Sequence, residues 1–346
     1  MNSPFPQSSS VDGKGRIVVR LLPKGISGLE VFEFQYPLKL VTPKHPPPTS
    51  ALVYLLSYGG GLVGGDKVNL TIHVQTGARL SLATQGHTKI FKSARPDIVT
   101  RQTMHVDIDT GGAVCLLPDP VQPFARSVYE QTQIFKLARN ASLCLLDWVI
   151  EGRSALGEHW SFVKWVGRNE VWAAAAAAAG SSSGQSPAAT GTGGAQDRLL
   201  VRDVAILDGQ KAHPQLPGLR ESMNELTLFG TLILRGPLMK AVGEFFLAEF
   251  AVLPRLGARD WRSDDAQRSD ESDALLSPRE RWRKGRLQKE KDDKVLWSAA
   301  SVRGCVVVKF GAPTFEAGRL WLGSMLAEEG SISKNFGEQA LMCLRW

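Results

Sequence analysis

The sequence predicts a mainly β fold of irregular stacked β-layers, a helical β-sheet arrangement, with two α-helices. Many segments alternate apolar and polar residues, which is the period of a β-strand. In three places such a segment meets a turn containing Gly or Asn, and an apolar strand led by Ala78, Ala113 or Ala141 follows. Units of this kind cover one another's apolar faces when they stack. Because the three alanines are unequally spaced, a strict solenoid is not implied.

The same periodicity sets the order of the strands. The turns at Gly77, Gly111 and Asn140 carry residues that hairpin turns need, so we expect the strands on either side of each turn to pair. Strands are expected over 16–22, 29–36, 52–56, 68–74, 78–83, 104–108, 113–117, 134–137, 141–146, 162–172, 199–207, 226–234 and 298–310.

Two later segments have the spacing of a helix instead. Residues 237–253 place apolar side chains on one helical face, and Pro237 suits a first turn. Residues 314–326 do the same, with Thr314 suited to the N-cap position. These two helices are plausible partner-binding elements, although packing on the core is at least as good an interpretation.

The chain reads as one β-rich domain over 16–346, preceded by a polar, disordered N-terminus over 1–15. Two segments interrupt the domain. The first, at about 173–197, is a tract of Ala, Gly and Ser, and the second, at about 258–294, is densely charged with both signs. Neither composition offers much to bury, so both are predicted to be disordered insertions, the second as a solvated loop or frayed helix. Strand sequence resumes after each, so neither marks a domain boundary.

Composition excludes several classes of function. The 346 residues are 43% hydrophobic, which allows a large core, and the net charge of +7 is dispersed, so no nucleic-acid partner is predicted. No apolar run approaches the length of a membrane span, and the N-terminus lacks a secretory signal, so we expect a cytoplasmic protein with no membrane partner. The cysteines form no C-x-x-C pair and are expected to be buried free thiols: Cys115, Cys144, Cys305 and Cys343.

The densest local signal is a run of glycines closed by Asp66. Three of them fit the G-x-G-x-x-G spacing of a dinucleotide site, but that motif needs a helix after its last glycine, and 68–74 has the period of a strand. A Walker loop also fails, because Asp66 stands where the lysine is needed and would repel phosphate. A tight turn between strands is the better interpretation. The glycines are Gly59, Gly60, Gly61, Gly64 and Gly65.

No catalytic set is recognisable, since G-x-S-x-G and H-E-x-x-H are both absent, and no catalytic residue is predicted. The carboxylates are more suggestive. Asp147 and Glu151 would share one face of a strand. With Glu158 they form a polar seam able to hold or pass a divalent transition metal. The plain alternative is an ion pair of Arg153 that fixes a turn, and the residues alone favour it.

His87 is the most suggestive of the six histidines. It lies in a small, polar segment, 83–89, between strand-like stretches. Taken alone, an ordinary loop histidine is the favoured interpretation.

Four segments, in this order, resemble the UreD (UreH) family of urease accessory proteins. The combination of the glycine segment with the Pro-Asp-Pro and Gly-Arg segments is specific, whereas any one alone is weak. The resemblance runs from about Arg16 to the C-terminal tail, interrupted by the two insertions. The segments are 57–66, 83–90, 117–125 and 147–160.

The resemblance implies a non-enzymatic scaffold, or chaperone, for urease maturation with a β-rich, helically stacked fold. Such a protein binds the urease apoprotein and a UreF-like protein, which bridges to a UreG-like GTPase. The assembly delivers nickel to the urease active site through a polar passage. No tightly bound cofactor is implied, only transient nickel. The GTP belongs to a partner, in agreement with the failed Walker test.

The resemblance also suggests which residues lie near the passage. Asp66 matches an acidic position after the glycines, whereas His87 stands where the family more often has a small residue. The candidates for the nickel path are Asp66, Asp147, Glu151, Glu158 and His87, and Gly152 and Arg153 join the five glycines as structural positions. Two alternatives stay open, namely a nucleotide-dependent enzyme using the 59–65 loop and a generic β-scaffold of another complex.

Overall fold

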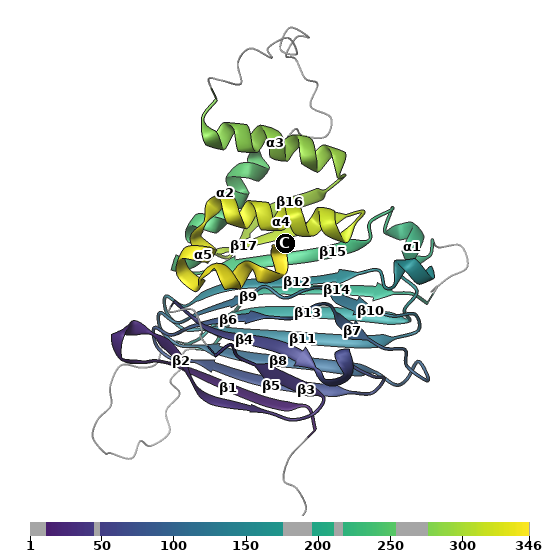
Figure 1. The fold of residues 1–346 in the computed structure, drawn as a ribbon, viewed down its shortest axis with the longest axis horizontal. Helices are drawn as coiled ribbons and strands as arrows, with labels where there is room; N and C mark the ends of the chain where they lie inside the picture. The colour runs from purple at the N-terminus through teal and green to yellow at the C-terminus, as the bar shows by residue number, and fades with distance from the viewer. Residues whose placement is uncertain (1–11, 45–48, 176–195, 211–216, 254–275, 346) are drawn as a thin grey trace, which may run out of the picture.

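The computed structural model describes residues 12–44, 49–175, 196–210, 217–253 and 276–345. Two β-sheets pack face to face, and a layer of helices covers the outer face of the second sheet (Figure 1). The fold is therefore mainly β, as predicted. No helix within the described ranges is long and apolar enough to cross a membrane.

The first sheet has seven strands. In spatial order they are β14 (Arg198–Asp208), β13 (Lys164–Ala173), β11 (Val128–Leu137), β8 (Thr100–Ile108), β5 (Lys67–Val74), β1 (Lys14–Leu21) and β2 (Ser27–Phe34). The four strands β13, β11, β8 and β5 pair in parallel, so the centre of this sheet is a parallel stack.

The second sheet has ten strands. Its main path is β16 (Leu296–Val302), β17 (Cys305–Ala312), β15 (Leu228–Arg235), β12 (Ser142–Ile150), β9 (Ala113–Leu116), β6 (Arg79–Ala83), β4 (Ala51–Ser57) and β3 (Leu38–Val41). Two short strands complete it, β10 (Val121–Pro123) beside β12, and β7 (Thr88–Ile90) beside β10.

The three predicted turns connect the two sheets, so the expectation of paired strands on either side of each turn is wrong. β5, β8 and β11 lie in the first sheet, and the strands that follow them, β6, β9 and β12, lie in the second. Each strand pairs in parallel with its counterpart in the next repeat. The turns also stack, because the Gly77 amide donates to the Thr110 carbonyl (3.1 Å) and the Gly111 amide to the Arg139 carbonyl (3.2 Å). The expected stacked β-layers are thus present.

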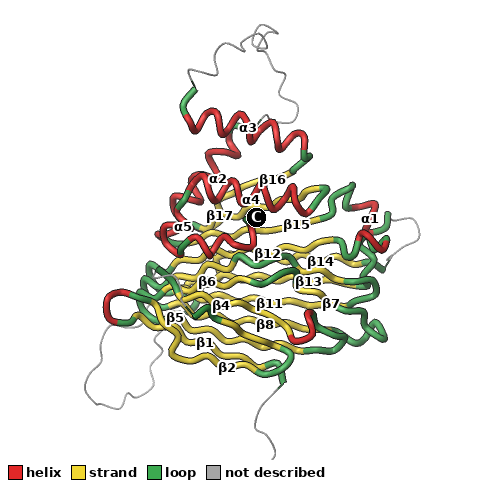
Figure 2. The backbone as a smooth tube through the Cα atoms, viewed as in Figure 1, coloured by secondary structure: helices red, strands yellow, loops and turns green. Residues whose placement is uncertain are grey.

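Figure 2 shows the two sheets and the helical layer, and the two larger apolar cores of the described chain lie between these layers. One lies between the sheets, where β5 contributes Val68, Leu70, Ile72 and Val74 from alternate positions. The other lies between the second sheet and the helices. Every residue of β12 is buried, because this strand has a core on each face. All four cysteines are buried and free, as predicted.

Both predicted helices are present, as α2 (Lys240–Ala251) and α4 (Phe315–Glu329). The Thr314 hydroxyl accepts the Ala317 amide (3.1 Å), so the expected N-cap is formed. Both helices pack on the second sheet. Shorter helices are α1 (Leu219–Ser222) and α5 (Ser331–Phe336), with 3-10 segments at Pro23–Gly25, Tyr58–Gly60, Ser154–Leu156, Pro237–Met239 and Glu338–Leu344.

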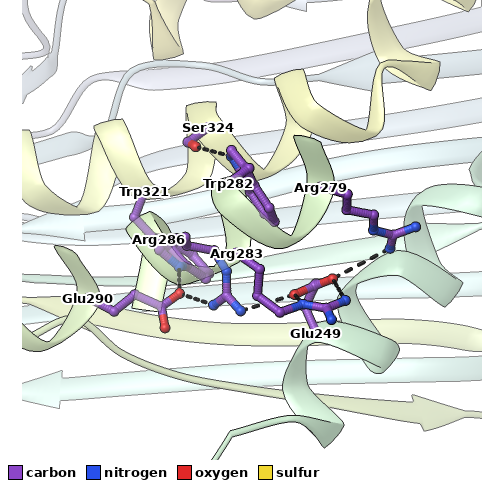
Figure 3. Close-up of polar contacts among 8 residues, drawn as sticks. All are labelled: Glu249, Arg279, Trp282, Arg283, Arg286, Glu290, Trp321 and Ser324. Carbon is purple, nitrogen blue, oxygen red and sulfur yellow. Dashed lines mark hydrogen bonds and ion pairs between the residues drawn. The ribbon is translucent and has the colours of Figure 1, made fainter. Parts of the chain in front are cut away.

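A further helix, α3 (Pro278–Asp292), lies inside the segment predicted to be a disordered insertion over about 258–294, so that prediction is wrong for this part. Ser277 and Glu280 form a capping box at its start. The charges of α3 are not merely solvated, because three of its arginines bind the buried Glu249 of α2 (Figure 3). Residues 254–275, and residues 176–195 and 1–11 of the other predicted disordered segments, lie outside the described chain.

Candidate functional site

A cavity of about 200 Å³ lies between the two sheets, and we refer to it as the inter-sheet cavity. It is large enough to hold several water molecules. Its walls combine apolar side chains with a nearly equal number of polar ones. The polar side chains among its lining residues are Lys39, Ser57, Thr84, Gln85, His87, Thr88, Gln102, Asp119, Gln131, Gln133 and Asp147.

Asp147 is the buried acidic group of this cavity. It lies on β12 and points toward the first sheet, and it is 7% exposed. Two neutral amides of the first sheet hold its carboxylate. Gln131 of β11 donates through Nε2 to Oδ1 (2.9 Å), and Asn169 of β13 donates through Nδ2 to Oδ2 (2.6 Å).

Each of these amides is itself held by a donor. The Tyr129 hydroxyl donates to Gln131 Oε1 (3.0 Å), and Gln133 Nε2 donates to Asn169 Oδ1 (3.0 Å). Two chains of hydrogen bonds, one through Gln131 and one through Asn169, therefore donate in the direction of Asp147. A buried polar network of this kind fixes the geometry of its members, since an unpaired polar group there is costly.

The electrostatics leave Asp147 without a full counter-charge. Burial raises the pKa of Asp147, and the hydrogen bonds from Asn169 and Gln131 lower it only in part. Lys309 also lowers this pKa, but its Nζ is bonded to Asp203 (2.7 Å). Within the described residues Asp147 has no ion-pair partner. A cation entering the cavity would supply the missing charge.

A second polar group of the cavity surrounds Asp119. Its Oδ2 accepts the Thr84 hydroxyl (2.8 Å) and the Gly86 amide (2.9 Å), which fixes the loop that carries His87. The His87 ring packs edge-on against Phe315 at the start of α4, with ring centroids 4.8 Å apart. Burial lowers the pKa of His87, and Asp119 offsets this only in part. The imidazole is therefore neutral near pH 7, which is the form that binds metals.

The glycine run forms the turn that brings the chain to this cavity. Gly60 lines the cavity, and Gly61 lies against the backbone of β7. A Cβ at Gly61 would come within 2.8 Å of the Lys89 carbonyl oxygen, so a side chain there is excluded. The neighbouring Leu62 amide donates to that same carbonyl (2.8 Å). The other positions, Gly59, Gly60 and Gly65, have positive φ, and Gly64 packs on Ser93.

The strand β5 begins directly after this turn, at Lys67. The helix that a dinucleotide motif requires after Gly65 is therefore replaced by a strand, as the periodicity predicted. Asp66 closes the turn, because its Oδ2 accepts the Val63 amide (2.9 Å). It does not line the inter-sheet cavity.

The Gly-Arg segment forms a separate cluster. Arg153 donates to the Glu158 carboxylate from Nε (2.9 Å) and from Nη2. Its guanidinium carbon lies 4.1 Å from the centroid of the Phe124 ring. The bond from Arg153 lowers the pKa of Glu158. Gly152 has a φ of +122° and fits between the Glu158 and Pro123 carbonyls. The arginine ion pair that the residues favoured is thus the observed geometry.

The structure brings two of the five predicted path residues, Asp147 and His87, to one cavity. Glu151 lies one residue beyond β12 and binds His159 Nδ1 (2.8 Å) instead. Asp66 and Glu158 have the separate contacts given above. In the described part of the chain, no group of three or more His, Cys, Asp or Glu side chains is placed to hold a metal ion.

Sequence reasoning missed the amides that hold Asp147. A signal for one of them, Gln131, was present in β11, where Gln131 and Gln133, which bonds Asn169, occupy the inward positions between Tyr129 and Phe135. Polar residues on the buried face of a strand need partners, so they mark a polar interior. Asn169 carries a weaker signal, because its inward direction depends on the register of β13.

Comparison with known proteins gives a consistent result. The family model described as UreD urease accessory protein matches residues 12–342. An uncharacterized urease accessory protein ureD-like of Schizosaccharomyces pombe is 33% identical over 300 residues, covering 86% of this chain and 88% of that protein. Urease accessory protein UreD of Sorangium cellulosum is 36% identical over 236 residues, covering 68% of this chain and 65% of that protein. Urease accessory protein D of Arabidopsis thaliana is 31% identical over 161 residues, covering 46% and 54%.

Proposed function

The chain belongs to the UreD family of urease accessory proteins, and on that premise we propose that it is a scaffold for nickel delivery to urease. In this proposal it binds the urease apoprotein and, together with a UreF-like protein and a UreG-like GTPase, supports insertion of nickel into the urease active site. Membership of an accessory-protein family agrees with a role in urease maturation and with a non-enzymatic protein. In this proposal the maturation of urease by this chain takes place in the cytoplasm, where the urease apoprotein is.

The observation that carries the proposal is the buried Asp147 in the inter-sheet cavity. Nickel is the cargo, so the site must bind it weakly enough to release it. An uncompensated carboxylate attracts a divalent cation, and neutral amides can turn their oxygens toward it. Oxygen and imidazole groups suit a transition metal in transit, whereas thiolates would hold it more firmly. Asp147 and Gln131 supply oxygen groups, and His87 supplies an imidazole.

A buried thiol beside the cavity, that of Cys343, does not compete for the metal. Cys343 donates through Sγ to the Thr84 carbonyl (3.4 Å), close to the loop that carries His87. Burial raises the pKa of Cys343 to about 12, so the thiol stays protonated at neutral pH. Because the thiolate is the form that binds metals, this cysteine is a packing residue. Asp66 and Glu158 are kept out of the proposed path, since each has a local structural partner.

The proposal is tested in a strain that lacks this chain and any close paralogue. Urease is purified from cells grown on limiting nickel, and its metal content is measured. We expect urease with little nickel and normal amounts of protein, restored by the full chain supplied in trans. A tagged full chain should also co-purify with the urease apoprotein and the UreF-like protein. Fully metallated urease in the deletion strain would show that nickel delivery does not need this chain.

A further inference from the structure

The first sheet ends at β14, and this edge has the features of a strand-accepting surface. β14 has 11 residues, Arg198–Asp208, and contains no Pro or Lys, the residues that usually protect an exposed edge. It is the terminal strand of its sheet in the described chain. Two large apolar side chains on its outer face, Val204 and Ile206, are 46% and 60% exposed.

The second sheet extends beyond this edge. Two contacts place the β16–β17 hairpin next to β14. Lys309 Nζ of β17 donates to Asp203 Oδ1 (2.7 Å), and Arg303 Nη1 of the turn between the two strands donates to the Leu199 carbonyl (3.1 Å). β16 is one strand further out than β17, at the helical end of the molecule (Figure 1). Among the residues that the structure describes, the first sheet has no strand that covers β16.

The uncovered face of β16 is mostly apolar. Trp297 and Ala299 face the helices and belong to the helical core. The alternate positions therefore face the other way. Leu296 and Val302 there are 60% and 40% exposed, and Ser298 and Ala300 are exposed between them. The edge of β14 and this face of β16 form a step, which we call the β14 groove.

We propose that the β14 groove accepts one extended strand of a partner protein, which adds to the first sheet beside β14. The backbone of the strand would pair with the free edge of β14. Its inward side chains would cover Leu296, Ala300 and Val302, and its outward side chains would lie beside Val204 and Ile206. The segment should therefore be apolar at most positions, and small on its inward face.

Charge sets the direction of the segment. Arg198 and Arg303 lie at the end of the groove where β14 begins, and Asp208 lies at the other end. Neither Arg198 nor Asp208 has an ion-pair partner in the described chain. A segment with an acidic residue beside Arg198 and a basic residue beside Asp208 is complementary to both ends.

A second copy of the chain does not fit this groove. Antiparallel pairing of two β14 strands requires a two-fold axis perpendicular to the sheet. The second copy would then bring its own β15, β17 and β16 beneath its β14, into the space that β16 of the first copy occupies. The step is open to a single strand and closed to a two-layered partner, so we assign it to an extended segment.

This inference stands on the edge of β14, and only the choice of peptides in its test rests on the proposed function. Short overlapping peptides that tile the urease apoprotein, the UreF-like protein and the UreG-like protein are bound to the full chain. Hydrogen exchange is then followed at each β14 amide. We expect one mainly apolar peptide to bind and to protect every second amide of β14 from Val201 onward, where the pairing with β13 is regular, since only those amides face the free edge.

Variants locate the binding surface. Leu296→Lys and Val302→Lys place a charge on the exposed floor of the groove, and each should weaken binding of that peptide by about ten-fold or more. Leu21→Lys is the matched control, since Leu21 is a 46% exposed leucine of β1, and it should bind as wild type. The inference is overturned if no peptide protects β14, if both groove variants bind normally, or if the free chain already protects these amides. Nickel content of urease in the deletion strain tests the proposed function separately.

Discussion

Asp147 and Glu249 are both buried carboxylates, but the protein stabilises them in opposite ways. Glu249, in the helical layer, is fully buried and binds Arg279 (3.4 Å), Arg283 (2.7 Å) and Arg286 (3.0 Å) (Figure 3). Asp147, between the sheets, is held only by neutral amides. Burial raises the pKa of both groups, but at Glu249 the bonds and charges of the arginines outweigh it, and the net pKa is lowered.

We interpret the difference as one between a structural charge and the charge of the proposed transit site. The arginines of α3 neutralise Glu249 and thereby attach that helix to α2. Around them, Arg286 also binds Glu290, whose Oε1 accepts the Trp321 indole N–H (2.6 Å). Nothing in the described chain neutralises Asp147 in this way, and a cavity lies next to it. A charge that is costly in the empty protein becomes favourable when a cation arrives, which is the property a transit site needs.

The largest expected effect comes from breaking the helical network. Glu249→Gln removes the buried charge that three arginines share, including one of the two carboxylate partners of the buried Arg286, and we expect the free energy of unfolding to fall by about 3 kcal/mol. Urea unfolding followed by the fluorescence of Trp282 and Trp321, which lie in this layer, measures it. Glu244→Gln is the matched control on the same helix, because its pair with Lys240 is exposed, and it should cost less than about 0.5 kcal/mol. Equal losses in the two variants would mean that the network does not hold α3.

A smaller loss is expected from removing one amide that holds Asp147. Asn169→Leu keeps the size of the side chain but deletes the donor to Asp147 and the acceptor for Gln133. We expect the free energy of unfolding to fall by about 2 kcal/mol, because two buried polar groups lose a partner. Gln75→Leu, which removes an exposed amide bonded to Glu30, is the control and should be nearly neutral. If the two variants were equally stable, the network would have no role in holding Asp147.

Removal of the Asp147 charge itself should have the smallest effect on stability. Asp147→Asn keeps a polar group of the same shape and removes a buried charge that has no counter-ion. We expect a change in the free energy of unfolding within about 1 kcal/mol, with either sign, measured by urea unfolding at neutral pH. A loss as large as that of Glu249→Gln would show that Asp147 is ion-paired and structural, and the comparison would fail.

The two carboxylates should also respond to pH with opposite sign. The pKa of folded Glu249 lies below its ordinary 4.5, so its stabilisation is present above pH 4.5 and is lost as the pH falls through the folded pKa. The pKa of folded Asp147 lies above its ordinary 3.8, so its neutral form favours folding below pH 3.8, and this contribution is lost as the pH rises through the folded pKa. The free energy of unfolding is measured for wild type, Glu249→Gln and Asp147→Asn across this pH range. The difference between wild type and each variant, plotted against pH, gives one slope for each carboxylate. Slopes of the same sign would contradict the assigned pKa directions.

The sequence allowed prediction of the elements that depend on local pattern. Strand periodicity, the strand directly after Gly65, and the helices α2 and α4 all follow from residues close together in the chain. Pairing across the turns was mispredicted, because a Gly or Asn turn looks the same whether it joins neighbours in one sheet or two sheets. Helix α3 was missed because Glu249, the residue that neutralises its arginines, precedes it by about 30 residues, beyond any local window.

The candidate site divides in the same way. Asp147 could be predicted as a candidate because an acidic residue inside an apolar strand is conspicuous. Its grouping with Glu151 and Glu158 followed from closeness in sequence, and the structure gives those two residues the local partners His159 and Arg153. The amides of Gln131 and Asn169 reach Asp147 from the opposite sheet, and only the packing of the two sheets determines that contact.

In the proposed function, the uncompensated charge of Asp147 serves nickel transit. The most direct measurement is the nickel content of urease matured on limiting nickel by the Asp147→Asn chain, with wild type and Glu244→Gln as references. We expect the Asn variant to fold and to co-purify with its partners as wild type does, but to yield urease with much less nickel. Urease metallated to the wild-type level by a folded Asp147→Asn chain would contradict the claim.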